Sequence, residues 1–197
     1  MKNLSRSKNY KNATAYSQRE KLPVGAYKIK IVDVKFVDNS DRGFANQIVL
    51  AFDIAEGEHK GFYKRDFDNN TNEDKKWRGT YRFWEPTDDG SERDGWAQSR
   101  LKTIVNAFED SNSGFTWDWD EQKLKGLVVG AIFNDKEWEY NGKTGFFTNC
   151  YSLIPVEDIP KAKIPQPTLL KNHKSSGYSG DTDFVNTSDI EEEEIPF

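Results

Sequence analysis

Reactive side chains are scarce in this sequence, which has one cysteine and two histidines among 197 residues. A lone cysteine, Cys150, excludes a disulfide within the chain, and we expect it in the core of a strand. His59 falls in a predicted turn and His173 in a predicted linker, which argues against a histidine metal site or a Ser-His-Asp triad. The phosphate-binding motif G-x-x-x-x-G-K-[ST] is missing too. We therefore expect no catalytic activity and no cofactor.

Two acidic pairs are the remaining candidates for chemistry. Asp88-Asp89 and Asp118-x-Asp120 have carboxylates of the kind that hold Mg²⁺ in nucleases. Both pairs lie in sequence rich in Gly, Ser and Trp, so we favour solvated carboxylates. A metal-dependent nuclease stays open as a third hypothesis, to be tested by Mg²⁺-dependent cleavage.

Long apolar runs are also missing. None approaches the roughly 18 residues that cross a membrane, and the first residues lack the apolar stretch of a secretory signal. Hydrophobic residues make up 35% of the chain and charged residues 31%, values typical of a soluble protein with polar segments. We expect a cytoplasmic protein without a membrane partner.

The net charge of -5 hides a strong segregation of charge along the chain. Residues 181–197 contain seven acidic and no basic residues, whereas residues 1–21 and 161–180 are basic. Residues 22–160 are net -7, which argues against a simple basic DNA-binding domain. All of that excess lies in residues 85–121. We expect this acidic insertion to point away from any anionic partner.

Alternating apolar residues predict an antiparallel meander that starts near residue 22. The apolar phase of the first strand slips by one residue near Asp33, which indicates a β-bulge. After a turn at residues 39–43, a second strand covers residues 44–54, and we place the third strand at residues 61–67. The phenylalanines assigned to the core are Phe36, Phe44, Phe52, Phe108 and Phe133.

The second half of the predicted domain contains a helix and a hairpin. Apolar residues at helical spacing predict about three turns that begin near Trp96 and end near residues 110–112. A strand buried on both faces is predicted at residues 127–133. Asn141-Gly142 between alternating segments predicts a hairpin turn. Beyond residue 159 the pattern is lost.

This order of elements predicts a mainly β fold, namely an OB-fold: a five-stranded Greek-key barrel with a helix-containing insertion between strands 3 and 4. Periodicity alone also allows another small mixed barrel. We assign residues 22–159 to this domain, residues 1–21 to a flexible basic arm, residues 160–180 to a linker rich in Pro, Lys, Ser and Gly, and residues 181–197 to an acidic tail.

The acidic tail ends in two large apolar groups around a proline. The segment that we expect to bind proteins comprises Asp189, Glu191, Glu192, Glu193, Glu194, Ile195, Pro196 and Phe197. A partner would bury Phe197 in an apolar pocket and attract the acidic run with a basic rim; the alternative is a tail that only aids solubility. The arrangement closely resembles the C-terminal tip of bacterial and phage single-stranded-DNA-binding proteins.

The body more weakly resembles phage-encoded single-strand-binding proteins of Gram-positive hosts. The resemblance covers most of residues 22–155 through generic strand signatures, which are residues 25–29, 52–54 with Gly57, 61–63 and 124–126. A phage-encoded protein would act in the host cytoplasm. Bacterial members of the family are often tetrameric or carry several OB-folds, and the sequence leaves open whether this chain forms a homo-oligomer.

Single-strand binding requires cations along the backbone and aromatic faces for base stacking. The candidate residues for single-stranded DNA are Lys28, Lys30, Arg42, Tyr63, Lys64, Arg65, Trp77, Arg78, Tyr81, Arg82, Trp84, Trp138 and Lys143. Core packing is the alternative for each aromatic residue.

These patterns predict a protein that coats single-stranded DNA without strong sequence preference during replication, recombination and repair. The family resemblance implies that the tail recruits helicase, primase, polymerase-associated or recombination-mediator proteins. We also expect the tethered tail to compete weakly with DNA for the cationic groove. The alternative hypothesis is a protein-interaction adaptor whose barrel binds a protein and whose tail docks on the replication machinery. RNA binding is left open.

Overall fold

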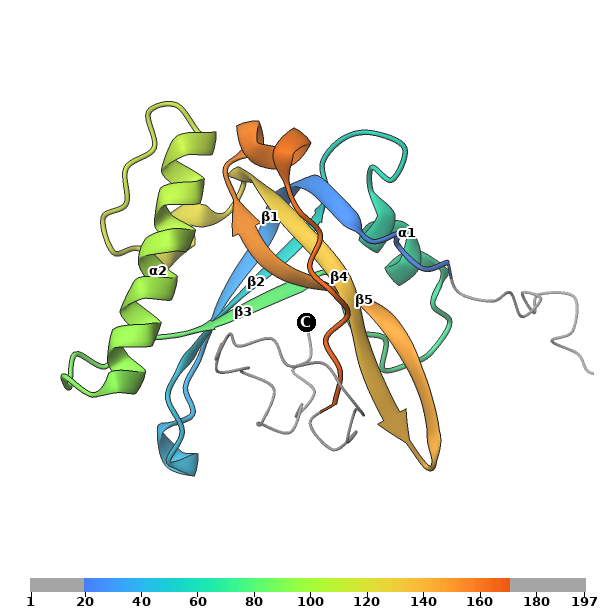
Figure 1. Cartoon of the computed structure of the whole chain (residues 1–197), viewed down its shortest axis with the longest axis horizontal. Coiled ribbons are helices and arrows are strands. Elements are labelled where there is room, and N and C mark those ends of the chain that lie inside the picture. The colour runs from blue at the N-terminus through green and yellow to red at the C-terminus, as the bar shows by residue number, and fades with distance from the viewer. Residues whose placement is uncertain (1–19, 171–197) are drawn as a thin grey trace, which may run out of the picture.

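The computed structural model describes residues 20–170, which form a five-stranded antiparallel sheet with two α-helices and three short 3-10 helices (Figure 1). The strand order is β3-β2-β1-β4-β5, so β3 and β5 are the two edges. The predicted mainly β fold is confirmed, with a sheet that remains open between these edges. The strands are β1 (Gly25–Val37), β2 (Gln47–Ile54), β3 (Thr80–Trp84), β4 (Val128–Tyr140) and β5 (Lys143–Ile154).

The predicted bulge in β1 is present. The register between β1 and β2 shifts between Ile31 and Asp33, which leaves Val32 as the extra residue. Ile31 and Val34 are therefore both buried although they are three residues apart. A bulge keeps both halves of a long strand in phase with the core.

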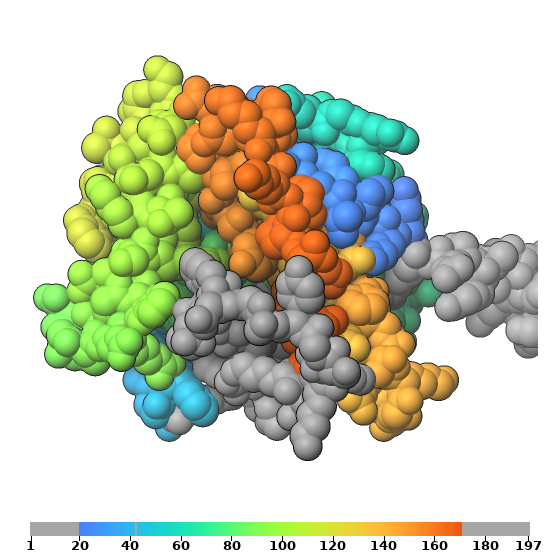
Figure 2. Space-filling view, in the orientation of Figure 1, coloured from blue at the N-terminus to red at the C-terminus, as the bar shows by residue number. Residues whose placement is uncertain are grey.

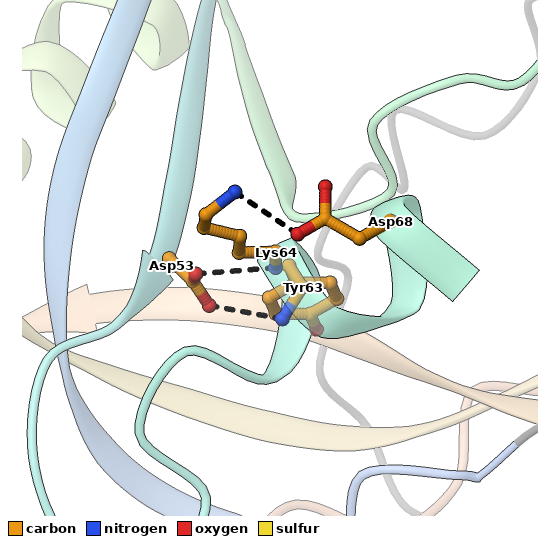
Figure 3. A network of polar contacts seen from close by, with 4 residues as sticks. All are labelled: Asp53, Tyr63, Lys64 and Asp68. Atoms are coloured by element: carbon orange, nitrogen blue, oxygen red, sulfur yellow. Dashed lines mark hydrogen bonds and ion pairs between the residues drawn. The ribbon is translucent and has the colours of Figure 1, made fainter. Parts of the chain in front are cut away.

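The predicted third strand at residues 61–67 is wrong, because this segment forms helix α1 (Phe62–Asn69). The helix begins where the Asp53 carboxylate, at the end of β2, accepts hydrogen bonds from the backbone N–H groups of Tyr63 (2.9 Å) and Lys64 (3.2 Å) (Figure 3). The first turn of a helix has no internal partners for these N–H groups, so an acceptor there stabilises it. Asp53 lies ten residues before Tyr63 in the chain, beyond the reach of a local apolar pattern.

The actual third strand is β3, which pairs with β2 and completes the meander. Its alternate residues Tyr81 and Phe83 are buried, whereas Arg82 between them is exposed. Tyr81, Arg82 and Trp84 of this segment, a mixture of aromatic and cationic residues, are among the predicted DNA-binding residues. The structure shows that the mixture is the ordinary alternation of a strand with one buried face.

Helix α2 (Glu92–Ser111) has 20 residues, more than the three turns predicted. It begins earlier because the Ser91 hydroxyl accepts a hydrogen bond from the N–H of Asp94, a typical N-cap. Inside the helix, Asp94 is buried, and its carboxylate accepts hydrogen bonds from the N–H groups of Thr87 and Asp88. The predicted apolar stripe Leu101, Ile104, Val105 and Phe108 is confirmed as buried.

The predicted hairpin turn at Asn141-Gly142 is confirmed. Both residues have positive φ, 50° and 70°, as a two-residue turn of type I′ requires. The predicted buried strand and the first arm of the hairpin are one strand, β4, which is buried in its first half and exposed near the turn. The β1–β2 and β4–β5 hairpins both extend toward the bottom of Figure 1.

Three of the five phenylalanines assigned to the core are there. Phe52, Phe108 and Phe133 are fully buried, whereas Phe36 and Phe44 are 45% and 48% exposed. Phe36 lies one residue before the end of β1 and Phe44 lies in the loop that follows. Both are at the far end of the β1–β2 hairpin, so the core assignment of these two residues is wrong.

Cys150 is buried in β5, as expected. Burial raises the pKa of its thiol, and the nearby Arg100 only partly opposes this effect. Sequence reasoning missed this basic neighbour, which lies 50 residues earlier in the chain and meets Cys150 only in the folded protein.

The folded part continues beyond residue 159. The 3-10 helix Val156–Lys161 leads to a segment that lies along β4. There the N–H of Thr168 donates to the Asp135 carbonyl, and the Thr168 carbonyl accepts from Glu137. Pairing of β1 with β4 stops at Phe133, so the segment occupies an edge that is otherwise open. Figure 2 shows it in orange on the molecular surface. The predicted linker therefore starts later than residue 160.

Within the described residues, no helix combines the length and the apolar character that crossing a membrane requires.

Candidate nucleic-acid interface

The register of the sheet assigns alternate residues to two faces. The inner face carries the core, and α2 packs on it through residues such as Ile104 and Phe108. The opposite, outer face carries Lys28 and Lys30 of β1. In β3, Arg82 lies opposite Val49 and Trp84 lies opposite Gln47 on the same outer face. Four of the predicted DNA-binding residues therefore share one side of the sheet.

Four cations, Lys28, Lys30, Lys35 and Arg82, lie on this outer face. Lys30 and Arg82 are exposed, and Lys28 forms a 3.2 Å ion pair with Glu56. Lys35, Val49 and Arg82 are aligned in one row across three strands. Val49 is fully buried there, as expected when the aliphatic stems of long cationic side chains flank an apolar residue. Sequence reasoning missed Lys35, although the bulge shifts it onto the face of Lys28 and Lys30.

Tyr63 and Tyr81 do not belong to a stacking surface, which corrects both predictions. Their exposed fractions are 6% and 4%, and the Tyr63 ring meets Phe52 edge-on at 5.4 Å. Burial raises the pKa of the Tyr63 hydroxyl, and it raises that of Tyr81 to about 12. The guanidinium of Arg100 lies 5.5 Å from the Tyr81 ring on the inner side. Both tyrosines stabilise the core.

The tryptophans Trp77 and Trp84 are half-buried at the outer face. The Trp77 indole N–H donates to the Phe52 carbonyl at 3.0 Å, and its ring lies 5.8 Å from the ring of Phe67. The Arg93 guanidinium lies 5.3 Å from the Trp84 ring, within the range of a cation–π contact. Each indole is held in a fixed position and keeps part of its surface open.

The remaining predicted cations near this face lie on or beside α1. Lys64 forms an ion pair of 3.0 Å with Asp68, and Arg78 forms one of 3.4 Å with Asp66. The Arg65 guanidinium donates to the backbone carbonyl of Lys60. Lys64, Arg65 and Arg78 are exposed, so these contacts leave them in contact with solvent.

The tip of the β4–β5 hairpin carries the last predicted pair. Trp138 is 38% exposed and packs against Gly145, where an added Cβ would lie 2.9 Å from the indole. Lys143 is exposed and lies opposite Tyr140 in the β4–β5 register, and Tyr140 is 71% exposed. Sequence reasoning missed Tyr140, which lies on the same strand face as Trp138. The hairpin presents two aromatic rings beside one cation.

Arg42 ends the 3-10 helix Ser40–Arg42 in the β1–β2 loop. The predicted protein-binding segment 189–197 and most of the basic arm lie outside the described residues.

A shallow apolar hollow lies on the outer face near the bulge. Its lining residues are Val32, Asp33, Ala51, Phe67 and Trp77, and its volume is about 190 Å³. At its rim, the Asp33 carboxylate pairs with the Lys125 ammonium at 2.8 Å. This hydrogen bond lowers the pKa of Asp33. Of the lining residues, only Trp77 was predicted as a site residue. The others come together through the bulge and α1.

The acidic insertion lies mainly on the other side of the sheet. Helix α2 packs on the inner face, and Figure 1 shows it on the opposite side of the strands from α1. Among residues 20–170, no three His, Cys, Asp or Glu side chains are grouped so that they could hold a metal ion. In the acidic pairs, Asp118 pairs with Lys123, and Asp89 accepts a hydrogen bond from the Ser91 N–H.

No protein-family model matches the chain, and a search of curated proteins finds no match.

Proposed function

We propose that this chain binds single-stranded DNA along the outer face of β1, β2 and β3, without strong sequence preference. The observation that carries the proposal is the combination of exposed Lys30 and Arg82 with the half-buried indoles of Trp77 and Trp84 on one face. Cations neutralise phosphates and release counterions, while indole faces stack with bases of any sequence. Lys30, Arg82 and Trp84 are held by strands, and Trp77 is held by its hydrogen bond to the Phe52 carbonyl.

The topology supports an OB-fold as the architecture of this site. A meander, then a helix, then a hairpin that pairs with β1 is the strand arrangement of that fold. Here α2 follows β3, and β4 pairs with both β1 and β5. The edge strands β3 and β5 approach to within 8 Å between Cα atoms. In this proposal the sheet curls into a barrel, and OB-folds bind nucleic acid across strands 2 and 3 and the flanking loops.

The first test is a titration with fluorescent oligo-dT and with a duplex of equal length, at two salt concentrations. We expect salt-dependent binding to the single strand and far weaker binding to the duplex, because stacking requires unpaired bases. Oligo-dT should also quench tryptophan fluorescence. Equal affinity for both DNA forms, or no binding at all, would contradict the proposal.

The acidic tail has two roles in this proposal. It recruits replication and recombination proteins through its Ile-Pro-Phe end, and it competes with DNA for the cationic face. Deletion of residues 181–197 is expected to raise the affinity for oligo-dT at low salt, with a smaller gain at high salt because screening weakens the competition. The same titration measures both. An unchanged affinity would exclude the competition.

A second candidate function, the protein-interaction adaptor, is favoured by one observation in the acidic insertion. Trp119 is 77% exposed at a positive φ of 68°. Beside it, the indole N–H of Trp117 is buried and has no hydrogen-bond partner among residues 20–170. Exposed tryptophan is enriched at binding hot spots, and strained backbone is enriched at functional sites. The adaptor predicts no salt-sensitive quenching by oligo-dT, which separates the two candidates.

A further inference from the structure

The hollow on the outer face has no role in the fold described above. It exists because the bulge turns Val32 outward, 38% exposed, beside the short side chain of Ala51. Phe67 from α1 and Trp77 from the next loop form the opposite wall. The walls are apolar except for the Asp33 carboxylate at the rim. Four segments that are separate in the chain thus line one shallow apolar hollow.

Two ammonium groups contact residues that line this space. The Lys75 ammonium lies 4.5 Å from the centre of the Phe67 ring. The Lys125 ammonium pairs with Asp33, and both side chains are substantially exposed. An exposed ion pair contributes little and exchanges partners readily, so Lys125 can contact a phosphate. An apolar hollow with two ammonium groups on its lining residues fits an apolar ring carried on an anionic chain.

We propose that the hollow holds one nucleobase of the bound single strand. This inference rests on the proposed function and names the subsite that receives a base. The volume of about 190 Å³ is below the roughly 300–1,000 Å³ of sites for drug-sized ligands, so it suits a single ring system and leaves the sugar and phosphate outside. The base contacts the rings of Trp77 and Phe67, and its phosphates contact Lys75 and Lys125. The Asp33 carboxylate accepts hydrogen bonds from N–H groups at the base edge.

The test fills the hollow without changing charge. Val32→Phe places a ring in the space, and Val24→Phe is the matched control because Val24 is 46% exposed and lies outside the hollow. Each protein is titrated with oligo-dT and with an oligomer of abasic sites of the same length. The abasic oligomer keeps the phosphates and lacks the bases. Circular dichroism and a thermal melt confirm that both variants fold.

We expect Val32→Phe to lower the affinity for oligo-dT about tenfold, the effect of one lost base contact, while its affinity for the abasic oligomer stays unchanged. Val24→Phe should change neither. Wild-type affinity of Val32→Phe for oligo-dT, or an equal loss for both oligomers, overturns the base subsite and leaves DNA binding intact. If the wild-type protein binds neither oligomer, the proposed function fails, and the subsite with it.

A second measurement uses the unchanged protein, so it does not depend on the folding of a variant. Oligo-dT that contains 5-iodouracil is bound, irradiated and digested, and the crosslinked peptides are identified by mass spectrometry. We expect crosslinks at Trp77 or Phe67. Efficient crosslinking only to aromatic residues elsewhere, such as Trp138, would overturn the subsite.

Discussion

The two faces of the sheet differ in what covers them. The inner face is closed by α2, and its residues, such as Phe52 and Phe133, are completely buried. The outer face is bordered by α1, and it carries exposed cations beside partly open indoles. Close packing restricts which residues the inner face can carry. The outer face is partly exposed, so it accepts a wider range of residues. The outer face is therefore the one on which the proposed DNA site lies.

Tyr81 and Arg82 are consecutive residues of β3 that lie on opposite faces of the sheet. Both were predicted to bind DNA, and the strand points one inward and the other outward. Substitution of the two positions should therefore separate stability from binding.

The largest expected effect is on the inner face. Tyr81→Ala should lower the free energy of unfolding by about 3 kcal/mol, because it leaves a cavity beside Phe83. Denaturant-induced unfolding measures the loss. The folded fraction should retain its affinity for oligo-dT. A loss below about 1 kcal/mol would mean that Tyr81 is not part of the core.

The next effect is on the outer face. Arg82→Glu should weaken binding to oligo-dT about tenfold at low salt and flatten the salt dependence by at least about 0.7 in the log–log slope, the value for one phosphate contact on a single strand. Lys102→Glu is the matched control, because Lys102 is an exposed cation on α2. Equal losses in the two variants would mean that binding follows overall charge and not the outer face.

A smaller effect tests the helix that borders the outer face. Asp53→Ala removes the acceptor for the first N–H groups of α1 and should destabilise the protein by about 1 kcal/mol. Asp53→Asn retains a side-chain acceptor and should lose less. Denaturant titrations compare the three proteins. If Asp53→Asn is as unstable as Asp53→Ala, the acceptor does not explain the helix.

The smallest effect concerns the ion pair at the hollow. The hydrogen bond from Lys125 lowers the pKa of Asp33 in the folded state. The stability from this pair is therefore fully present above the unfolded-state pKa of about 3.9 and is lost as the pH falls through the lower folded-state value. Because the pair is exposed, we expect less than about 1 kcal/mol.

Lys125→Met removes the pair and provides the measurement. The difference in unfolding free energy between the wild type and this variant should exist near pH 6 and vanish near pH 2, a direction fixed by the lowered pKa. A difference that grows as the pH falls would contradict this assignment. The urea unfolding curves of both proteins at the two pH values decide it.

Part of the site could be read from the sequence and part could not. Lys30, Arg82 and Trp84 were predicted and share the outer face, because their types and alternation are local features. Tyr63 was misassigned because α1 replaces the expected strand and directs this side chain into the core. Tyr81 was misassigned because the inner and outer phases of β3 depend on its pairing with β2. A shift of one residue in this pairing would exchange the buried and the exposed member of two adjacent residues.

The sequence by itself determined the features that depend on neighbouring residues. The bulge near Asp33, the turn at Asn141-Gly142, the buried first half of β4 and the stripe of α2 all follow from local periodicity and from the φ values that single residues prefer.

Only the tertiary structure decided the features that need distant partners. Helix α1 depends on an acceptor from β2, the segment around Thr168 depends on the open edge of β4, and the hollow depends on four separate segments. These partners meet only when the chain has folded, because a hydrogen-bond acceptor, a free strand edge or an apolar wall has no signature in the residues that it contacts.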